Sequence, residues 1–465
     1  MKKVRLLGLI SFLTLCFFIS FGFTCYSPTA HTNTFASESI YDVNNSSFSV
    51  IDRKITFDIR SLPEKAYESA GDFLLYDAKV TATYTYKNHT NMDITTKLFL
   101  PVTQIPDYGI LFDEDFNALY PDNLNKHSVS INNALSTTVL RHTLPETNAM
   151  YDYHLSSENL PKDNFIASPY NINKDTPVIK LTYLLENTDK AFTYVKINTQ
   201  NENDKFLVDS FSGTDILGVQ KNRTFTVYAL NYSVIPNIEF TTFSDFDLEY
   251  PTNATVSLIE SETSSLLDTL LSFKRDDSIT DMDWYNAQIQ SMYFYGKCAD
   301  VEYLQNLTLS RWLEYSLFIP ANDTAVVETI TPIYPFIDYE YEPASYVFCF
   351  KLPVSQYLDE DDIDIDLITP LYIEYLDYTT VTDHSSFWDG DGYELEYDDE
   401  LGAEISFALS ETESEFFYDF DDTGLIIGTV ILLVLPIVFV GAGLLTTVLI
   451  VRKDKKKFSK AKENK

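Results

Sequence analysis

The sequence predicts a mostly β protein with two antiparallel β-sandwich-like (Ig-like) regions, a small helical insert between them and one C-terminal transmembrane helix. Three observations predict this. Segments of β-branched and aromatic residues recur along the chain, one short stretch has helical spacing, and an uncharged apolar run is followed at once by lysines. With 465 residues, 45% of them hydrophobic, the chain is long enough for two or three domains with buried cores.

The clearest strand pattern covers residues 79–101. Apolar residues alternate with threonines over positions 80–86, which places them on one face of a strand. Turn-forming residues follow at 88–93, and a second strand is expected over 94–100, ended by Pro101. We therefore predict a β-hairpin with one buried face.

Further segments rich in β-branched and aromatic residues favour strands, and Asn, Asp and Pro separate them as in antiparallel sandwiches. No repeat of fixed period is present, so a solenoid is not expected. We predict an N-terminal sandwich region over 37–260 and a second one over 311–407. The segments are 48–59, 177–186, 192–198, 223–234, 238–250, 254–260, 311–321, 324–335, 344–354 and 363–376.

Residues 261–310 are predicted to be a helical connector between these regions. Thr280 stands three residues before Asp283, as in a capping box. Apolar residues then recur with helical spacing, and their aromatic rings are expected in the core rather than at a ligand site. A second short helix is expected over 301–307. The apolar residues of the first helix are Tyr285, Ile289, Met292 and Tyr293.

The N-terminus predicts a secretory signal peptide over residues 1–36. Three basic residues come first, and an apolar stretch follows to about Phe23. Small residues favour cleavage after Ala36, and Ala30 is a second candidate. The alternative interpretation is an uncleaved membrane anchor.

The C-terminus predicts a single membrane span. The segment 425–451 is a run of 27 uncharged residues, and a helix of about 20 residues is long enough to cross a bilayer. The tail, residues 452–465, carries eight basic and two acidic residues, which keeps it in the cytoplasm and the rest of the chain outside. Residues 408–424 are acidic and are predicted to form a juxtamembrane stalk. The alternative for 425–451 is a buried core helix.

The charge of the chain bears on its partners. Its formal net charge is −36, and without the two ends 22 basic and 67 acidic residues remain, a charge near −45. Such a surface repels nucleic acid and anionic membrane surfaces. We expect the membrane and an extracellular protein or glycan as partners, and no nucleic acid.

Cysteines and acidic residues suggest two sites. Cys298 and Cys349 lie outside the predicted leader, and an oxidising compartment permits a disulfide between them; two thiols packed in the core are the alternative. The stretch WDGDGYELEYDDE offers carboxylates for calcium, the one cofactor we consider, although the order of an EF-hand is not met. Its glycines suit a tight turn, so a solvated acidic turn is the alternative. The candidate ligands are Asp389, Asp391, Glu394 and Glu396.

The motifs of common enzyme classes are absent: the sequence contains no HExxH, GxSxG, Walker loop or CxxC. We therefore predict a non-catalytic surface protein for adhesion, scaffolding or ligand display. A carbohydrate- or calcium-binding module, suggested by 32 tyrosines and the acidic clusters, is the first alternative. A surface hydrolase with paired carboxylates is the second.

Two parts of the chain resemble a known group of proteins. The strand pair beginning near Lys79 and the pattern IPAN…ITPIYP…YEPASYVFCF over 319–350 resemble pieces of uncharacterised membrane-anchored surface proteins of Gram-positive bacteria. The resemblance covers about a third of the chain and brings no catalytic motif. It implies β-sandwich ectodomains on a cell surface.

Overall fold

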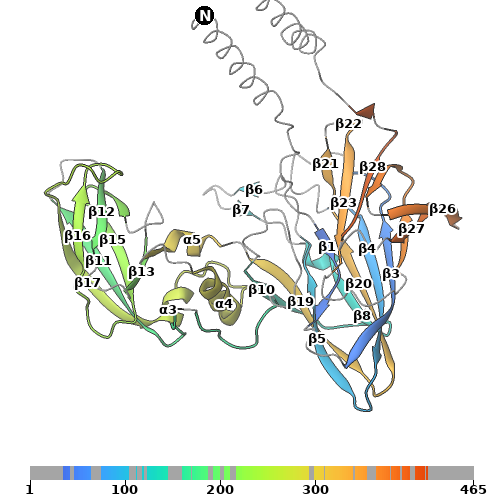
Figure 1. Cartoon of the computed structure of the whole chain (residues 1–465), viewed down its shortest axis with the longest axis horizontal. Coiled ribbons are helices and arrows are strands. Elements are labelled where there is room, and N and C mark those ends of the chain that lie inside the picture. Colours follow the sequence, from blue (N-terminus) through green and yellow to red (C-terminus); the bar gives the residue numbers. More distant parts are fainter. Residues whose placement is uncertain are drawn as a thin grey trace, which may run out of the picture. The chain divides into compact units, whose positions relative to one another are not determined.

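The computed structural model of the chain is mostly β (Figure 1). By its contacts the chain divides into a larger unit, 1–336 with 346–411, and a smaller unit, 337–345 with 412–465. The structure describes residues 35–41, 47–63, 75–103, 111–112, 118–119, 123–144, 160–168, 170–186, 192–198, 204–209, 216–292, 298–307, 309–338, 341–352, 363–377, 379–387, 390–397, 404–413 and 415–416.

Three sheets of the larger unit combine strands from both ends of the chain. The first has the order β26-β27-β24-β3-β4-β20-β8-β9, the second β10-β19-β5-β2, and the third includes β1-β23-β28-β25. Their strands are β1 (Phe35–Ser37), β2 (Ile40–Tyr41), β3 (Phe48–Asp58), β4 (Lys79–Asn88), β5 (Ile94–Pro101), β8 (Ser128–Ile131), β9 (Ala134–Leu135), β10 (Val139–Thr143), β19 (Ser310–Ile319), β20 (Thr324–Pro332), β23 (Ser345–Lys351), β24 (Ile363–Ile368), β25 (Tyr372–Asp377), β26 (Thr379–Phe387), β27 (Gly390–Tyr397) and β28 (Glu404–Ser410).

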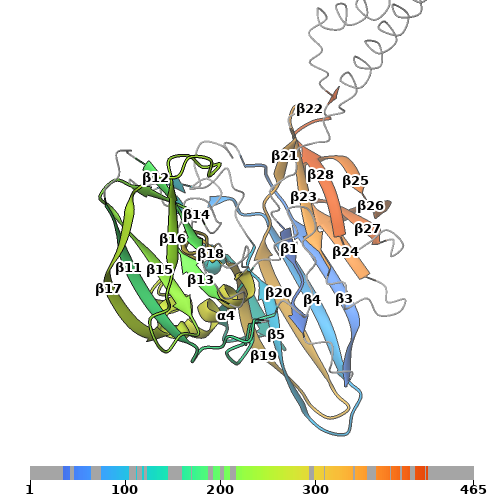
Figure 2. The same ribbon diagram turned by 60° about the vertical axis from the view of Figure 1, so that its left-hand side comes forward.

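Two further sheets use only strands from one continuous part of the chain, 177–300. Their orders are β17-β11-β15-β13-β18 and β14-β12-β16, and Figure 2 shows β17, β11 and β15 side by side. The strands are β11 (Pro177–Glu186), β12 (Phe192–Asn198), β13 (Lys205–Val208), β14 (Ile216–Gln220), β15 (Thr224–Leu230), β16 (Glu239–Phe243), β17 (Thr255–Ser265) and β18 (Cys298–Asp300).

The remaining elements are short. The helices are η2 (Leu124–Lys126), α3 (Leu266–Leu271), α4 (Asp281–Ser291) and α5 (Val301–Gln305), and the small strands are β6 (Leu111–Phe112), β7 (Ala118–Leu119), β21 (Phe336–Asp338), β22 (Tyr341–Glu342) and β29 (Glu415–Phe416). β6 pairs with β7 in the larger unit, and β22 pairs with β29 in the smaller one.

The predicted hairpin over 79–101 is wrong in its pairing, although both strands exist. β4 pairs with β3 and β20, whereas β5 pairs with β19 and β2 in another sheet. Asn88 fixes the crossing between the sheets: it is 0% exposed, and its side-chain amide donates to the carbonyls of Met92 (2.8 Å), Ile319 (3.1 Å) and Pro320 (3.0 Å). Alternation predicts a strand and its buried face, but it carries no information about the partner strand.

Strands from the predicted regions 37–260 and 311–407 share sheets. β4 and β5 come from the first region, and their partners β20 and β19 come from the second. The part with the two separate sheets lies between β10 and β19 in the sequence, so it is an insertion rather than half of the predicted first region. Periodicity could not predict this because it reports only local structure.

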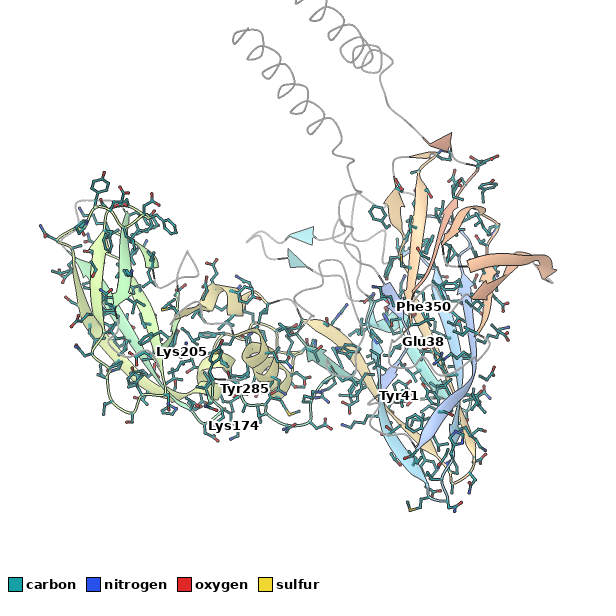
Figure 3. All side chains as sticks on the ribbon, viewed as in Figure 1. Glu38, Tyr41, Lys174, Lys205, Tyr285 and Phe350 are labelled. Atoms are coloured by element: carbon teal, nitrogen blue, oxygen red, sulfur yellow. The ribbon has the colours of Figure 1, made fainter. Side chains whose placement is uncertain are left out.

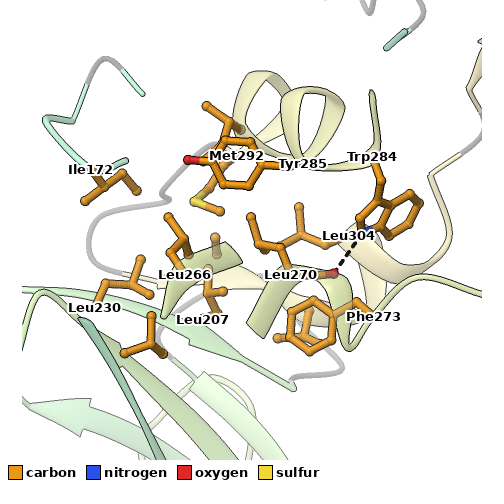
Figure 4. Close-up of a cluster of buried hydrophobic side chains, with 14 of the residues drawn as sticks. Ile172, Leu207, Leu230, Leu266, Leu270, Phe273, Trp284, Tyr285, Met292 and Leu304 are labelled. Atoms are coloured by element: carbon orange, nitrogen blue, oxygen red, sulfur yellow. Dashed lines mark hydrogen bonds between the residues drawn. The ribbon is translucent and has the colours of Figure 1, made fainter. Parts of the chain in front are cut away.

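The inserted part has two adjoining cores. One draws side chains from both sheets, including Leu181 on β11, Val195 on β12 and Leu217 on β14, each 0% exposed. The other joins α3 and α4 to the ends of the strands and contains Leu230, Leu270, Trp284 and Tyr285 among others (Figure 4).

The predicted helix is present as α4. Thr280 is its N-cap and accepts the Asp283 backbone N–H at 3.1 Å. Tyr285, Ile289 and Met292 are buried as expected, whereas Tyr293 lies outside the described residues. The indole N–H of Trp284, also buried, donates to the carbonyl oxygen of Leu270 at 2.7 Å (Figure 4), which ties α4 to α3.

Most of the predicted ends lie outside the described residues. This is true of residues 1–34 of the leader, of the span 425–451 and of the tail 452–465. In the part of the chain that the structure describes, no helix is both long and apolar enough to cross a bilayer. At two boundaries strands overlap the prediction, because β1 includes residues 35–36 and β28 extends to Ser410 in the predicted stalk.

Candidate functional site

The predicted calcium ligands fall in a strand pair. Asp391, Glu394 and Glu396 lie in β27, where register places them opposite Ser386, Asp383 and Thr380 of β26, respectively. Asp389 lies outside the described residues. The glycines at 390 and 392 belong to β27 and not to the expected tight turn. Among the described residues no group of His, Cys, Asp or Glu is arranged to hold a metal ion, so calcium binding stays a prediction.

The structure places Cys298 and Cys349 in different sheets and does not join them to each other, so their disulfide stays a prediction. Cys298 is 0% exposed in β18 and pairs with Phe206 of β13. Cys349 lies in β23, a strand of a different sheet, with its Sγ 3.5 Å from Ser406 Oγ. Cysteine count alone could not predict this, because a bridge also needs Cα atoms within about 7 Å of each other.

A dense group of charged side chains surrounds Arg141 of β10. The Arg141 side chain is 7% exposed and binds the carboxylate of Asp283 on α4, which is 1% exposed. Nε lies 3.2 and 3.1 Å from the two carboxylate oxygens, and a terminal nitrogen donates to Oδ1 at 3.0 Å. Oδ2 also accepts the His142 backbone N–H at 3.1 Å. These bonds fix the first turn of α4 against β10.

The group continues outward to the surface. Arg141 also contacts Asp163 at 3.2 Å and Glu314 of β19, and the Lys97 ammonium of β5 lies 2.8 Å from each of these carboxylates. Side-chain exposure rises from 13% at Glu314 to 43% at Lys97 and 63% at Asp163. We call these four residues and Asp283 the charged anchor; it holds two positive and three negative charges.

The electrostatics of the charged anchor favour the charged forms of Arg141 and Asp163. Burial alone would lower the pKa of Arg141, but hydrogen bonds and charge from Asp283, together with Glu314 and Asp163, outweigh burial and raise it. The hydrogen bond from Lys97 is the largest cause that lowers the pKa of Asp163. Next to the anchor, burial lowers the pKa of His142, although the negative charge of Asp283 acts in the opposite direction and raises it. The hydrogen bonds between Arg141 and Asp283 therefore have a structural role, because they hold α4 against β10.

A second buried polar group lies between β1 and β2. Glu38 is 1% exposed, and its Oε1 has no hydrogen-bond partner among the described residues. Tyr41, Tyr84 and Tyr86, each at most 4% exposed, surround this part of the core (Figure 3 labels Glu38 and Tyr41). The Tyr315 hydroxyl donates to Ser39 Oγ at 3.0 Å beside it.

Burial raises the pKa of the Glu38 carboxyl, while the charge of Arg53 and the Tyr84 side chain lower it less strongly. A carboxyl with a raised pKa is the chemistry of a general acid. Solvent does not reach this one, so it cannot meet a substrate in this structure.

Aromatic side chains gather on the outer face of the sheet β14-β12-β16. Phe192 and Tyr194 of β12 alternate with Thr193 and Val195, which are 0% exposed, so the two rings lie on the opposite face. Phe192 is 40% exposed, and Phe246, beyond β16, is 52% exposed. Ring centroids are 6.4 Å apart between Phe192 and Tyr194 and 5.8 Å apart between Tyr194 and Phe246. We call these three rings the outer aromatic face.

The neighbours of the outer aromatic face shape it. Gly218 of β14 pairs with Tyr194, and a Cβ at this glycine would lie 3.0 Å from Cε1 of Phe192, so the glycine leaves room for the ring. Lys196 follows on the same face of β12 and pairs with Thr241 of β16. The Asn198 amide donates to Thr241 Oγ1 at 2.6 Å. A polar row therefore borders the rings.

Sequence reasoning missed all three of these features. Arg141 and Asp283 are 142 positions apart, and neither residue has a local signal of their contact. A lone Glu38 beside apolar residues is a weak sign of a buried carboxyl. The segment FTYVKIN did show aromatic residues at alternate positions, but both of its faces contain apolar side chains, so the exposed face could not be identified.

Comparisons with known proteins do not assign a family. No family model matches the chain, and no curated protein matches it. Among solved structures, the chain is similar to a crystal structure of a proposed nutrient-binding protein from Legionella pneumophila. The two are 9% identical, the match covers 81% of this chain and 70% of that one, and the TM-score is 0.31. These values are too low to indicate a shared fold.

Proposed function

We propose that the chain is a single-pass surface protein whose exterior part binds an extracellular ligand without catalysis, in adhesion, scaffolding or ligand display. The leader-like start, the uncharged span and the basic tail support this topology. We also propose that the two sheets of the inserted part form an antiparallel sandwich, supported by the core that they share.

The observation that carries the proposal is the outer aromatic face. Phe192 and Phe246 are 40% and 52% exposed on a folded sheet, whereas the ions at the centre of the charged anchor are buried and already paired. Clustered exposed aromatic side chains mark binding surfaces more often than single ones do. The ligand is therefore expected on this face and not at the anchor.

Two measurements on cells test the proposal. Protease added to intact cells that produce the full chain with a C-terminal tag should digest the part before residue 425 and leave a small tagged membrane fragment. A photo-crosslinking residue at Phe246 should then capture an extracellular partner that the same residue at Phe318 does not. Phe318 is a matched control because it is 51% exposed on β19. Protection of the long acidic part from protease would contradict the topology, and equal crosslinking at both positions would contradict the binding face.

A carbohydrate ligand is the second candidate, and the polar row favours it. Sugar rings can stack on Tyr194 and Phe246 while their hydroxyls bond to Lys196, Asn198 and Thr241. We expect the full chain to bind a subset of a glycan array, and Tyr194→Ala to lose most of that binding. Phe318→Ala is the control for a lost exposed ring. Binding that is absent from the array, or that Tyr194→Ala does not change, would reject a carbohydrate ligand on this face.

A further inference from the structure

The segment Phe35–Tyr41 belongs to two sheets at once. β1 runs parallel to β23, with Phe35 opposite Cys349 and Ala36 opposite Phe350. Three residues later β2 pairs antiparallel with β5, with Ile40 opposite Phe99. Seven residues thus connect one sheet to another, and we call them the N-terminal clasp.

The N-terminal clasp is part of the core. Ala36 and Ile40 are 0% exposed, Ser37 is 3% exposed and Glu38 is 1% exposed. The Glu38 backbone N–H and the Ser37 hydroxyl both donate to the carbonyl oxygen of Lys351, at 3.3 and 3.0 Å. Such a segment is needed to complete the fold and is not a removable extension.

We infer that the leader of this chain is cut N-terminal to Phe35, between residues 23 and 35, and not after Ala36; this rests on the proposed export. Cutting after Ala36 would remove two of the three residues of β1. It would also create an α-ammonium on Ser37, where the residue is 3% exposed. A buried ammonium is strongly disfavoured unless it is well paired.

The bond Ala30–His31 lies N-terminal to Phe35 and follows a small residue. Hydrolysis there adds one water, breaks the C–N bond of the peptide and leaves a carboxylate on Ala30 and an ammonium on His31. The small Ala30 precedes the cut and supplies the last position of the A-x-A-like pattern that leader-removing peptidases recognise. Four residues remain before Phe35, which can separate the new ammonium from β1 by up to roughly 13 Å.

N-terminal labelling and mass spectrometry of the full chain, purified through a C-terminal tag, test this inference. The expected first residue lies between 24 and 35, with His31 as the assigned one. A chain that begins at Ser37 or later would overturn the inference while leaving the proposed topology intact. A chain that keeps Met1 or Lys2 would overturn both the cut and the predicted leader, and protease treatment of intact cells would then show separately whether the exterior location survives.

A matched pair of variants distinguishes the two candidate bonds. Ala30→Tyr removes the small residue before the assigned bond and should reduce processing several-fold. Thr34→Leu removes the small residue two positions before Ala36 and should leave processing unchanged. The reverse pattern would overturn the assignment.

A pair of deletions tests the role of the clasp itself. Deletion of residues 31–34 keeps β1 and should leave the yield of folded chain unchanged. Deletion of residues 31–36 brings the new terminus to Ser37 and should lower this yield and the thermal midpoint. Equal yields and midpoints would overturn the claim that Phe35 and Ala36 belong to the mature fold.

Discussion

Replacing Arg141 by Met should destabilise the protein more than any change at the exposed rim of the charged anchor. The substitution keeps much of the length of the side chain but removes the partner of Asp283, which is 1% exposed. Asp283 would keep the His142 backbone N–H at 3.1 Å and lose every bond to Arg141. Removing one member of a buried pair costs about 3–5 kcal/mol, and we expect a value within this range.

Two further variants separate charge from packing. Lys97→Met removes a side chain that is 43% exposed, and its two partners, Asp163 and Glu314, both keep their contacts with Arg141, so we expect a cost of about 0–1 kcal/mol. The double variant Arg141→Met with Asp283→Leu removes both buried charges. It should recover part of the loss, although the His142 N–H then loses its acceptor.

Urea unfolding followed by tryptophan fluorescence measures these differences. Trp284 on α4 follows Asp283 directly, and Trp312 lies on β19; both are 2% exposed and will report on loss of structure on the two sides of the anchor. The reasoning is refuted if Arg141→Met and Lys97→Met lower the free energy of unfolding equally. It is also refuted if the double variant is less stable than Arg141→Met alone.

Three other predictions follow from the core and the helix cap. Burial raises the folded-state pKa of Glu38, so the wild type should lose stability relative to Glu38→Gln as the pH rises above about 4.5. The loss should be at most about 1.4 kcal/mol per pH unit. A difference in the free energy of urea unfolding that does not change with pH would contradict this. Alkylation of the chain denatured without reductant should modify both Cys298 and Cys349, because they lie in strands of different sheets, and recovery of a peptide pair linked by a disulfide between them would contradict this. Thr280→Ala should cost about 1 kcal/mol and Thr280→Ser much less, because Ser retains the oxygen that accepts the Asp283 N–H; equal losses would show that the cap contributes little.

The sequence predicted local structure well and long-range structure poorly. The buried face of β4, with Tyr84 and Tyr86 at 2% and 1% exposure, follows from alternation, and the start of α4 follows from the Thr280 cap. Both signals lie within a few residues of the structure they predict. Strand partners have no such signal, so β4 and β5 were assigned to one hairpin although they lie in different sheets.

The same limit applies to the candidate sites. The contact of Arg141 with Asp283 depends on how an inserted part meets a sheet, and the burial of Glu38 depends on a segment that bridges two sheets. The cysteine count could not place Cys298 and Cys349, which lie in strands of different sheets. Charge and composition predict only the general class of partner, whereas the pairing of distant strands determines which side chains are exposed.

The insertion between β10 and β19 sets the order in which the chain can fold during synthesis. β5 must wait for β19, and the paired residues Ile94 and Ile319 are more than 200 positions apart. At about 5–20 residues per second, a ribosome needs on the order of 10–45 seconds to supply the second strand. The inserted sheets are complete before that moment, while β4 and β5 still lack their later partners β20 and β19, so each presents an open, aggregation-prone edge. Holdase chaperones that bind nascent or translocating chains are therefore expected to act on residues 35–101, and faster elongation through the insert should increase the soluble yield.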